Sequence, residues 1–386
     1  MDVTGARGET APDTDHPSGR DTAVPPATMA AVLLTGHGGL DKLEYRTDVP
    51  VPRPGPGEVL IAVTAAGINN TDVNTRVGWY SKSVGTDTGA GGAAGFAAVD
   101  DADATWSGTP LTFPRIQGAD ACGRIVEVGD GVEDGRVGER VLVRTMLRAP
   151  VGHRPFACWT FGSEIDGGFA QFTVAPAADT YAVRSDWSDE ELAAIPCAYS
   201  TAENMLHRAA AGAERVLVTG ASGGVGLAAV QLAKRRGATV TAVCSAAKAS
   251  GVAEQGADRT LDRDADVVDA LGPASVDVVV DLVGGPRWTR LLDALRPGGR
   301  YAIAGAIAGP IAEIDLRTLY LRDLSLLGCS FQEDAVFSDL VGYVERDEVR
   351  PVVSRTYPLA DIARAQEDFL AKRYLGKLVL VPEVTG

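Results

Sequence analysis

The sequence predicts an α/β protein with two domains, a compact β-barrel domain followed by a doubly wound parallel sheet. Over residues 28–190, short extended segments are separated by turns rich in glycine and proline, which is typical of a small barrel. Beyond residue 190, continuous apolar segments alternate with amphipathic helical ones, which indicates parallel strands covered by helices on both faces. The 386 residues are enough for two cores.

The first domain is predicted to consist of short strands. The segment 50–57 carries four prolines and cannot be helical, because proline fixes φ and lacks an N–H donor. The residues that follow it are rich in β-branched side chains and predict a strand. The expected strands are Met29–Leu34, Leu43–Asp48, Glu58–Ala65, Gly123–Val128, Arg140–Arg144 and Ala170–Val174.

The second domain is predicted to alternate helices with strands, and residues 331–386 to form a helix-rich segment that folds back onto the first domain. The expected helices are Glu190–Pro196, Thr201–Ala211, Val225–Arg236, Lys248–Gln255 and Arg287–Leu295. The expected strands are Val216–Thr219, Thr239–Cys244, Val276–Val283, Tyr301–Ala304, an apolar segment ending at Gly328, and Lys377–Val381 at the end of the chain.

The charge and the hydropathy exclude several classes of function. Subtracting 51 Asp and Glu from 36 Lys and Arg leaves a net charge of −15, which disfavours a general binder of nucleic acid or anionic membranes. A local basic pocket for one small anion stays compatible with this charge. No apolar run reaches the ~18 residues of a membrane span. Residues 1–27 lack the apolar core of a secretory signal, so they are expected to form a flexible tail of a cytoplasmic protein.

The five cysteines lie far apart and include no C-x-x-C pair. An odd number at such spacing fits neither a disulfide framework nor a zinc knuckle, and is typical of small thiols in a reducing compartment. They are Cys122, Cys158, Cys197, Cys244 and Cys329.

The strongest local signal is a dinucleotide-binding pattern at residues 215–234. A buried strand leads directly into a glycine-rich turn and an amphipathic helix, and a second strand follows at the expected distance. Such a turn brings backbone N–H groups and the positive end of a helix dipole to a pyrophosphate. A tight structural turn would explain the glycines alone, whereas the full strand–turn–helix context favours dinucleotide binding. The predicted contacts are Ser222, Gly223, Gly224, Val225 and Gly226.

The charge pattern after the second strand favours NADP(H) over NAD(H). An NAD site usually places Asp or Glu about 20 residues after the turn, to bind the ribose 2′-hydroxyl. Residues 242–248 contain no carboxylate, and instead Ser245 and Lys248 are available to a 2′-phosphate, with Arg263 following the next short strand. Each cation taken alone also fits a solvated surface residue.

Taken together, several sequence segments resemble those of the medium-chain dehydrogenases/reductases, in their zinc-free quinone oxidoreductase branch. The resemblance implies a GroES-like β-barrel catalytic domain (28–190, with an insertion at 81–112), a Rossmann NADP-binding domain (191–330) and a return segment (331–386). It rests on PGPGEVLI at 54–61 and on the segments Ala65–Asp72, Gly118–Gly123, Asp166–Gln171, Gly220–Gly226 and Leu375–Leu380.

The resemblance also implies a site without metal. Zinc-dependent relatives carry Cys where this chain has Asn69, and His-Glu where it has Ala119 and Asp120. Only Cys197 stands where a zinc ligand is expected. A catalytic zinc site needs three protein ligands, so no metal is predicted.

Further site residues follow from the same resemblance. Asn69 and Thr201 would hold the nicotinamide end of the cofactor, and Tyr80 would lie in the cleft, either as a hydrogen-bond donor to the substrate oxygen or as a packing aromatic. Asp72 is expected to tie down its loop rather than act as an acid, and Tyr199 is a reserve donor. Residues expected along the cofactor are Val283, Gly305 and Ala306.

The resulting prediction is an NADPH-dependent reductase of a small quinone or α,β-unsaturated carbonyl. Two alternatives stay open, a zinc-free carbonyl reductase or alcohol dehydrogenase, and a non-catalytic NADPH-binding protein. The resemblance implies a homodimer formed through an exposed edge strand of the Rossmann sheet. The Gly-rich, acidic insertion Ser81–Thr112 is read either as a substrate lid or as a disordered surface insertion.

Overall fold

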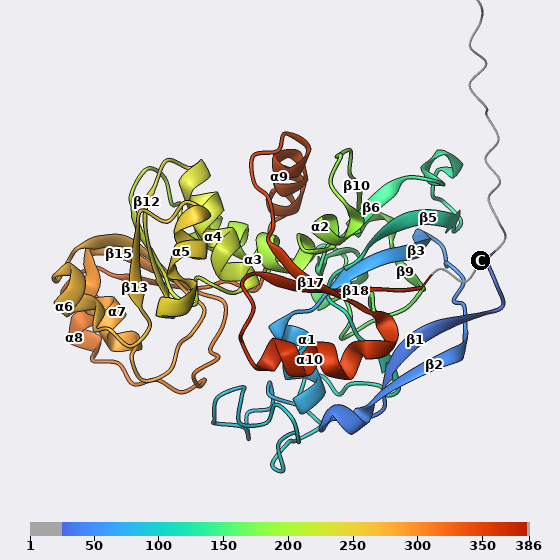
Figure 1. Ribbon diagram of the computed structural model, residues 1–386, viewed down its shortest axis with the longest axis horizontal. Helices are drawn as coiled ribbons and strands as arrows, with labels where there is room; N and C mark the ends of the chain where they lie inside the picture. Colours follow the sequence, from blue (N-terminus) through green and yellow to red (C-terminus); the bar gives the residue numbers. More distant parts are fainter. Residues whose placement is uncertain (1–24, 384–386) are drawn as a thin grey trace, which may run out of the picture.

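The computed structural model describes residues 25–383 as two domains side by side (Figure 1). The barrel-like domain and the domain with a parallel sheet confirm the predicted fold class. Most of the predicted tail, residues 1–24, lies outside the described residues. Within the part of the chain that the structure describes, none of the helices combines the length and the apolar character that a bilayer crossing requires.

The first domain is organised around the long central strand β3 (Glu58–Gly67). Its main sheet has the order β10-β6-β5-β3-β18-β17, and β9 also pairs with β3. Val59, Leu60 and Ile61 on β3 are fully buried, so this strand contributes to both cores of the domain. The other strands are β1 (Thr28–Leu34), β2 (Leu43–Pro50), β4 (Arg115–Ile116), β5 (Cys122–Val128), β6 (Arg140–Val143), β7 (Met146–Leu147), β8 (Trp159–Thr160), β9 (Phe172–Pro176) and β10 (Thr180–Ala182).

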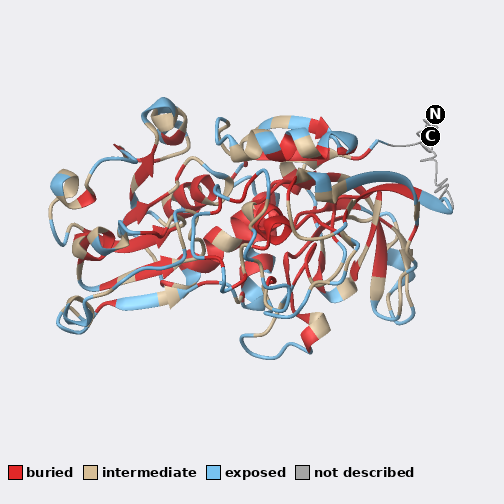
Figure 2. Ribbon diagram, turned by 90° about the horizontal axis from the view of Figure 1, so that it is seen from below, coloured by how far each residue is buried: buried red, intermediate tan, exposed pale blue. Residues whose placement is uncertain are grey.

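The second domain contains a six-stranded parallel sheet in the order β13-β12-β11-β14-β15-β16. This is the strand order of a dinucleotide-binding Rossmann sheet, with the change of direction at β11 and β14. The central strands of both sheets are largely buried, whereas β2 and β16 are largely exposed (Figure 2). The strands are β11 (Arg215–Val218), β12 (Thr239–Cys244), β13 (Arg259–Asp262), β14 (Val276–Asp281), β15 (Leu295–Ile303) and β16 (Ser325–Gly328); the helices are α4 (Gly224–Arg235), α5 (Ala249–Glu254), α6 (Val267–Leu271), α7 (Trp288–Ala294) and α8 (Leu316–Tyr320).

Two helices, α2 (Asp189–Ala193) and α3 (Pro196–Arg208), connect the domains. The sequence prediction ended one helix at Pro196 and began the next at Thr201, which was wrong. Pro196 is instead in the first turn of α3. That position suits proline, because the first N–H groups of a helix have no partner within the helix.

The last part of the chain returns to the first domain. It comprises α9 (Asp334–Glu345), β17 (Val353–Pro358), α10 (Ile362–Leu370) and β18 (Lys377–Val381). Strand β18 pairs antiparallel with β3, with Val379 opposite Gly67. Just before β18, the N–H of Gly376 donates to the carbonyl of Ser222 at 3.0 Å. The return segment therefore contacts the glycine-rich turn of the Rossmann domain as well.

Candidate active site

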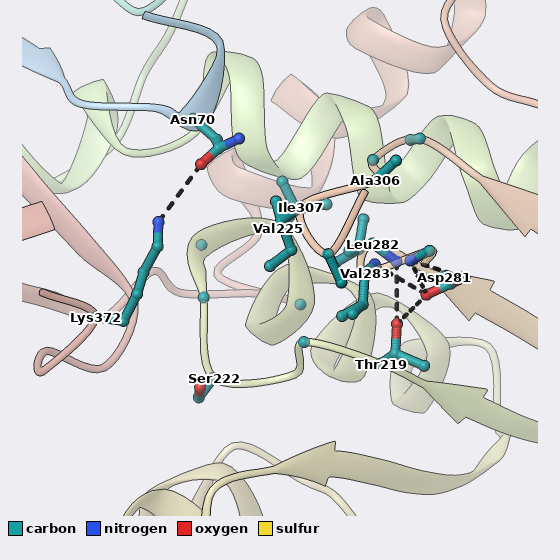
Figure 3. Close-up of a pocket in the computed structure, with 18 of the residues that line it drawn as sticks. Asn70, Thr219, Ser222, Val225, Asp281, Leu282, Val283, Ala306, Ile307 and Lys372 are labelled. Atoms are coloured by element: carbon teal, nitrogen blue, oxygen red, sulfur yellow. Dashed lines mark hydrogen bonds between the residues drawn. The ribbon is translucent and has the colours of Figure 1, made fainter. Parts of the chain in front are cut away.

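A cavity of about 960 Å³ lies between the two domains. Its walls come from α1 (Asn70–Val77), the turn between β11 and α4, the loops after β14 and β15, and the α10–β18 connection. Figure 3 shows the turn and these loops facing one another across the cavity. A cavity between two domains, with polar groups from both, is a usual place for a cofactor and substrate site.

The glycine-rich turn fits a bound dinucleotide. A Cβ at Gly226 would collide with the carbonyl oxygen of Gly220, so the close approach of α4 to the turn requires glycine there. At Gly223 the nearest atom to an added Cβ is 3.6 Å away, which leaves the backbone open on the cavity side. Helix α4 has 12 residues and begins at this point, so its N-terminal N–H groups face the cavity.

A buried carboxylate shapes the opposite wall. Asp281, at the end of β14, accepts hydrogen bonds from the hydroxyls of Thr219 and Tyr301 and from the N–H of Val283, the last at 2.9 Å. It also accepts from the N–H of Gly284 at 3.1 Å. These bonds fix the loop that carries Val283 into the cavity (Figure 3).

One end of the cavity is basic. Ser245, Lys248 and Arg263, which the sequence analysis assigns to the cofactor, line it, and so does the exposed Lys372 from the return segment. Lys248 Nζ donates to the carbonyl of Lys372 at 2.7 Å, and Lys372 Nζ donates to Asn70 Oδ1 at 3.4 Å. Figure 3 shows Lys372 extended toward Asn70.

The carboxylates at this basic end already have cationic partners. Asp264 lies 3.4 Å from Arg287, and Asp266 lies 2.7 Å from Arg290. The hydrogen bond from Arg290 lowers the pKa of Asp266 to about 2. Both carboxylates are therefore paired with arginines, whereas Lys248 donates to the carbonyls of Lys372 and Tyr374 and keeps its charge available to the cavity.

The other end of the cavity is built around a buried ammonium group. Lys377 Nζ donates to the carbonyl of Ile68 at 3.0 Å, to Asn69 Oδ1 at 2.5 Å and to Asp120 Oδ2 at 2.9 Å. Asn69 Nδ2 in turn donates to Asp120 Oδ2 at 2.8 Å. Lys377 is 3% exposed, and Gly224 gives its stem room, because a Cβ there would lie 2.7 Å from Lys377 Cδ.

This set of side chains does not fit a zinc ion. Cys197 borders the cluster, and its N–H donates to Asp120 Oδ1 at 2.6 Å. Burial raises the pKa of the Cys197 thiol well above its usual value, which disfavours the thiolate that zinc requires. Lys377 already supplies a positive charge to Asp120. Between residues 25 and 383, no three His, Cys, Asp or Glu side chains are grouped as a metal site would need.

Asp72 ties the start of α1 to the neighbouring loop and does not line the cavity. Its carboxylate accepts from the N–H of Asn69 at 2.7 Å and from the N–H of Ala119 at 3.0 Å. It is 2% exposed, and this burial raises the pKa of Asp72 to about 7.

The raised pKa of Asp72 makes a prediction about stability. A carboxyl whose folded pKa lies above its unfolded value of about 3.9 binds more protons in the folded state. Its contribution to stability is present below about pH 4 and is lost as the pH rises to about 7, with a slope of at most about 1.4 kcal/mol per unit. Between pH 5 and 7, the urea midpoint of the wild type should therefore fall relative to that of Asp72→Asn. If the urea midpoints of both proteins changed equally with pH, this prediction would be contradicted.

Tyr80 lies in the cavity beside two other aromatic residues. Its hydroxyl donates to Thr71 Oγ1 at 3.0 Å, and Trp106 Nε1 donates to the same oxygen at 2.7 Å. Burial raises the pKa of Tyr80 above its usual value, so the phenol keeps its proton at neutral pH.

Tyr199, the predicted reserve donor, is not part of the site. It is 1% exposed on α3, and its hydroxyl donates to Gln231 Oε1 at 3.0 Å. It therefore packs between α3 and α4 instead of reaching the cavity.

The cavity brings together the other predicted site residues and adds several that the sequence analysis missed. The predicted residues that line it are Asn69, Tyr80, Thr201, Ser222, Gly223, Gly224, Val225, Gly226, Ser245, Lys248, Arg263, Val283, Gly305 and Ala306. Those missed are Thr71, Trp106, Asp281, Lys372 and Lys377. Lys377 stands directly before the apolar residues of β18, and this position gave little sign of its burial, since lysines are rarely buried without partners.

Comparison with known proteins agrees with this geometry. Residues 55–185 match the family model of the alcohol dehydrogenase GroES-like domain, and residues 224–346 match that of the zinc-binding dehydrogenases. The fold and cavity define a nicotinamide-dependent dehydrogenase. The chain belongs to the medium-chain dehydrogenase/reductase superfamily, in its quinone oxidoreductase-like branch, which confirms the resemblance seen in the sequence.

Three similar proteins illustrate the range of the family. Quinone oxidoreductase from Rattus norvegicus is 29% identical over 92% of this chain and 98% of its own length. Acryloyl-coenzyme A reductase from Metallosphaera sedula is 28% identical over 91% of this chain and 99% of its own. The crystal structure of a proposed alcohol dehydrogenase from Sinorhizobium meliloti 1021 is 47% identical, with a TM-score of 0.83, over 93% of this chain and 98% of that one.

Proposed function

We propose that this oxidoreductase transfers a hydride from NADPH to a quinone or an α,β-unsaturated carbonyl without a metal ion. The observation that carries the proposal is the arrangement of the cavity. At one end it has a glycine-rich turn and two lysines, Lys248 and Lys372, that donate to neutral oxygens, and at the other a buried ammonium–carboxylate cluster. Relatives named as a quinone oxidoreductase and an acryloyl-coenzyme A reductase support the acceptor class.

Different residues of the cavity would bind different parts of the cofactor. A bound nicotinamide cofactor supplies the hydride, which the protein has no group to provide. The turn 222–226 would hold the pyrophosphate, and Lys248, Lys372 and Arg263 would hold the 2′-phosphate. Asn69 and Thr201 would orient the nicotinamide end, and Lys377 keeps Asn69 in place through its amide oxygen.

Thr71 and Tyr80 are proposed to hold a proton for the acceptor oxygen. A threonine hydroxyl has one proton and two acceptor positions. Tyr80 and Trp106 fill both acceptor positions of Thr71, which leaves its own proton for a third partner, and Thr71 lines the cavity. Such a donor stabilises the negative charge that develops on oxygen when an enone or quinone accepts a hydride.

The position of Lys377 beside Asp120 supports the proposal that the site holds no catalytic metal. An ammonium group 2.9 Å from Asp120 provides the positive charge that a zinc ion provides in metal-dependent relatives. A zinc ion entering the cluster would have to displace Lys377 against its three hydrogen bonds.

The test follows NADPH absorbance with quinones, enones, enoyl thioesters and aldehydes as acceptors. We expect oxidation of NADPH by a quinone or enone, unchanged by a chelator and much weaker with NADH. Activity that a chelator abolishes and Zn²⁺ restores would refute the metal-free proposal. Tight NADPH binding without turnover of any acceptor would identify a non-catalytic cofactor-binding protein.

A second candidate is a zinc-free carbonyl reductase or alcohol dehydrogenase. The 47% identity to a proposed alcohol dehydrogenase from Sinorhizobium meliloti favours it. If the protein oxidises simple alcohols with NADP⁺ and does not reduce quinones, this alternative would be correct.

We also propose that the protein forms a homodimer through β16. This strand ends the order of the Rossmann sheet, and large apolar side chains are exposed beside it. An exposed edge with apolar neighbours favours pairing with a second chain. The exposed side chains are Ile311, Leu316, Tyr320, Leu321 and Leu326.

A charged residue on β16 should therefore yield a monomer. We expect Leu326→Lys to reduce the mass measured by light scattering from that of two chains to that of one, because a buried lysine would lack a partner. Phe156→Lys is the control, since Phe156 is equally apolar and 75% exposed but lies in the first domain. A monomeric wild type, or dissociation in both variants, would contradict the assignment.

A further inference from the structure

Residues Ser81–Thr112, called here the insertion, pack against one end of the cavity without forming a helix or strand. They form the loops beside α1 in Figure 1. Arg76 on α1 is fully buried and anchors the insertion. Its Nη2 donates to the carbonyl of Gly92 at 2.6 Å, and its Nε donates to Gln366 on α10 at 2.8 Å. A buried arginine with such partners holds the segment in one place.

The insertion also reaches the Rossmann domain. The N–H of Thr88 donates to the carbonyl of Ile307 at 3.2 Å, and Ile307 lines the cavity. On the other side, Trp79 Nε1 donates to the carbonyl of Thr86 at 3.0 Å. The insertion therefore bridges both domains at the side of the cavity where Thr71 lies.

Three aromatic rings cover that side of the cavity, and the insertion supplies one of them. The ring centroids of Tyr80 and Trp106 are 5.3 Å apart, and those of Trp79 and Tyr80 are 5.8 Å apart. All three residues line the cavity. The rings are tilted, at 51° between Tyr80 and Trp106 and at 73° between Trp79 and Tyr80, so they present both ring faces and ring edges. This aromatic lining suits stacking or edge contact with a conjugated ring.

The charge of the insertion disfavours anionic acceptors. It carries four aspartates and one lysine, a net charge of −3. Asp87 lines the cavity, and the N–H groups of Gly89 and Ala90 fix its carboxylate at 2.9 and 3.0 Å. A coenzyme A thioester carries several phosphate charges, which this carboxylate would repel.

We infer that the insertion is the acceptor-selecting wall of the site, with Trp106 as its specificity-determining residue. It admits flat, uncharged, conjugated acceptors such as a quinone ring and disfavours coenzyme A thioesters. Trp106 also positions the proton of Thr71, because its N–H occupies one acceptor position of that hydroxyl. This inference rests on the proposed function, since it assumes that the acceptor binds beside Thr71.

The first experiment measures acceptor binding without turnover. Calorimetry gives the dissociation constant of 1,4-naphthoquinone for protein saturated with NADP⁺, in the wild type, Trp106→Ala and Trp106→Phe. We expect Trp106→Ala to weaken quinone binding about tenfold, the effect of losing roughly 1.4 kcal/mol of ring contact, and to leave NADPH binding unchanged. Trp106→Phe should keep binding within about threefold, because it retains a ring. Equal quinone binding by the wild type and Trp106→Ala would overturn the inference.

The second experiment measures selectivity with NADPH. Trp106→Phe lacks the indole N–H that donates to Thr71, so we expect it to lower kcat with naphthoquinone more than it changes KM. A purely structural role of Trp106 would not produce this difference between kcat and KM. Asp87→Asn keeps the turn-forming oxygen and removes the charge. It should raise kcat/KM for acryloyl-coenzyme A several-fold relative to naphthoquinone at low salt. Asp101→Asn, an exposed aspartate of the same insertion, is the control and should change neither value.

The outcomes separate the two proposals. If Asp87→Asn and Asp101→Asn have the same selectivity as the wild type, the charge argument is wrong. If the wild type reduces no acceptor, the proposed function fails. The calorimetric comparison of Trp106 variants still reports in that case whether the insertion binds a planar acceptor.

Discussion

Lys377→Met is expected to lower the free energy of unfolding by about 3–5 kcal/mol, the usual cost of removing one partner of a buried ion pair. Asp120 is 0% exposed and would lose its cationic partner, leaving the hydrogen bonds from Asn69 and from the N–H of Cys197. Urea denaturation of the purified protein, followed by circular dichroism, measures this change.

A double variant separates the ion pair from simple packing. Lys377→Met combined with Asp120→Asn removes both charges, so it should be more stable than Lys377→Met alone by about 1–3 kcal/mol. If the double variant loses as much stability as the two single variants added together, the two groups are not coupled. In that case the proposed electrostatic role of Lys377 would be wrong.

Lys248→Ala is expected to raise the KM for NADPH about 10- to 100-fold and to change the KM for NADH less than about threefold. One charge-assisted hydrogen bond to a phosphate contributes about 1.5–3 kcal/mol. NADH has no 2′-phosphate, so it makes no such bond with Lys248 and its binding should hardly change. Steady-state kinetics with both cofactors and one fixed quinone give the two ratios.

The comparison with NADH also tests for indirect effects. Lys248 donates to the carbonyls of Lys372 and Tyr374, so its loss disturbs the return segment as well. A disturbance of this kind would change both KM values equally and would remove Lys248 from the phosphate site. Lys42→Ala, a lysine outside the cavity, should leave both values unchanged.

Local patterns in the sequence were enough to predict the fold class. Proline and glycine turns bound the strands of the first domain, and the alternation after residue 190 is regular because each strand of the parallel sheet is buried on both faces. The strand–turn–helix at 215–234 was predicted for the same reason, since its chemistry depends on adjacent residues. The prediction failed at Pro196, where a proline that begins a helix was taken for one that ends it.

Much of the candidate site depends on contacts between distant parts of the chain, which local patterns do not reveal. Lys377 meets Asp120 and Asn69 only because β18 pairs with β3. Trp106 meets Thr71 because the insertion folds back onto α1. Tyr199 shows the converse, since its position near the expected cleft residues in sequence did not place its hydroxyl in the cavity.

The pairing of β3 with β18 also constrains how the protein is made. Gly67 and its neighbour Val379 lie more than 300 residues apart in the sequence, so β3 is synthesised long before β18. Before β18 is made, the first sheet therefore has an unpaired edge at Ala66 and Gly67, the end of β3, which is a surface prone to association with other chains. Until β18 has been synthesised, Lys377 cannot contact Asn69 and Asp120, so that part of the cavity is incomplete.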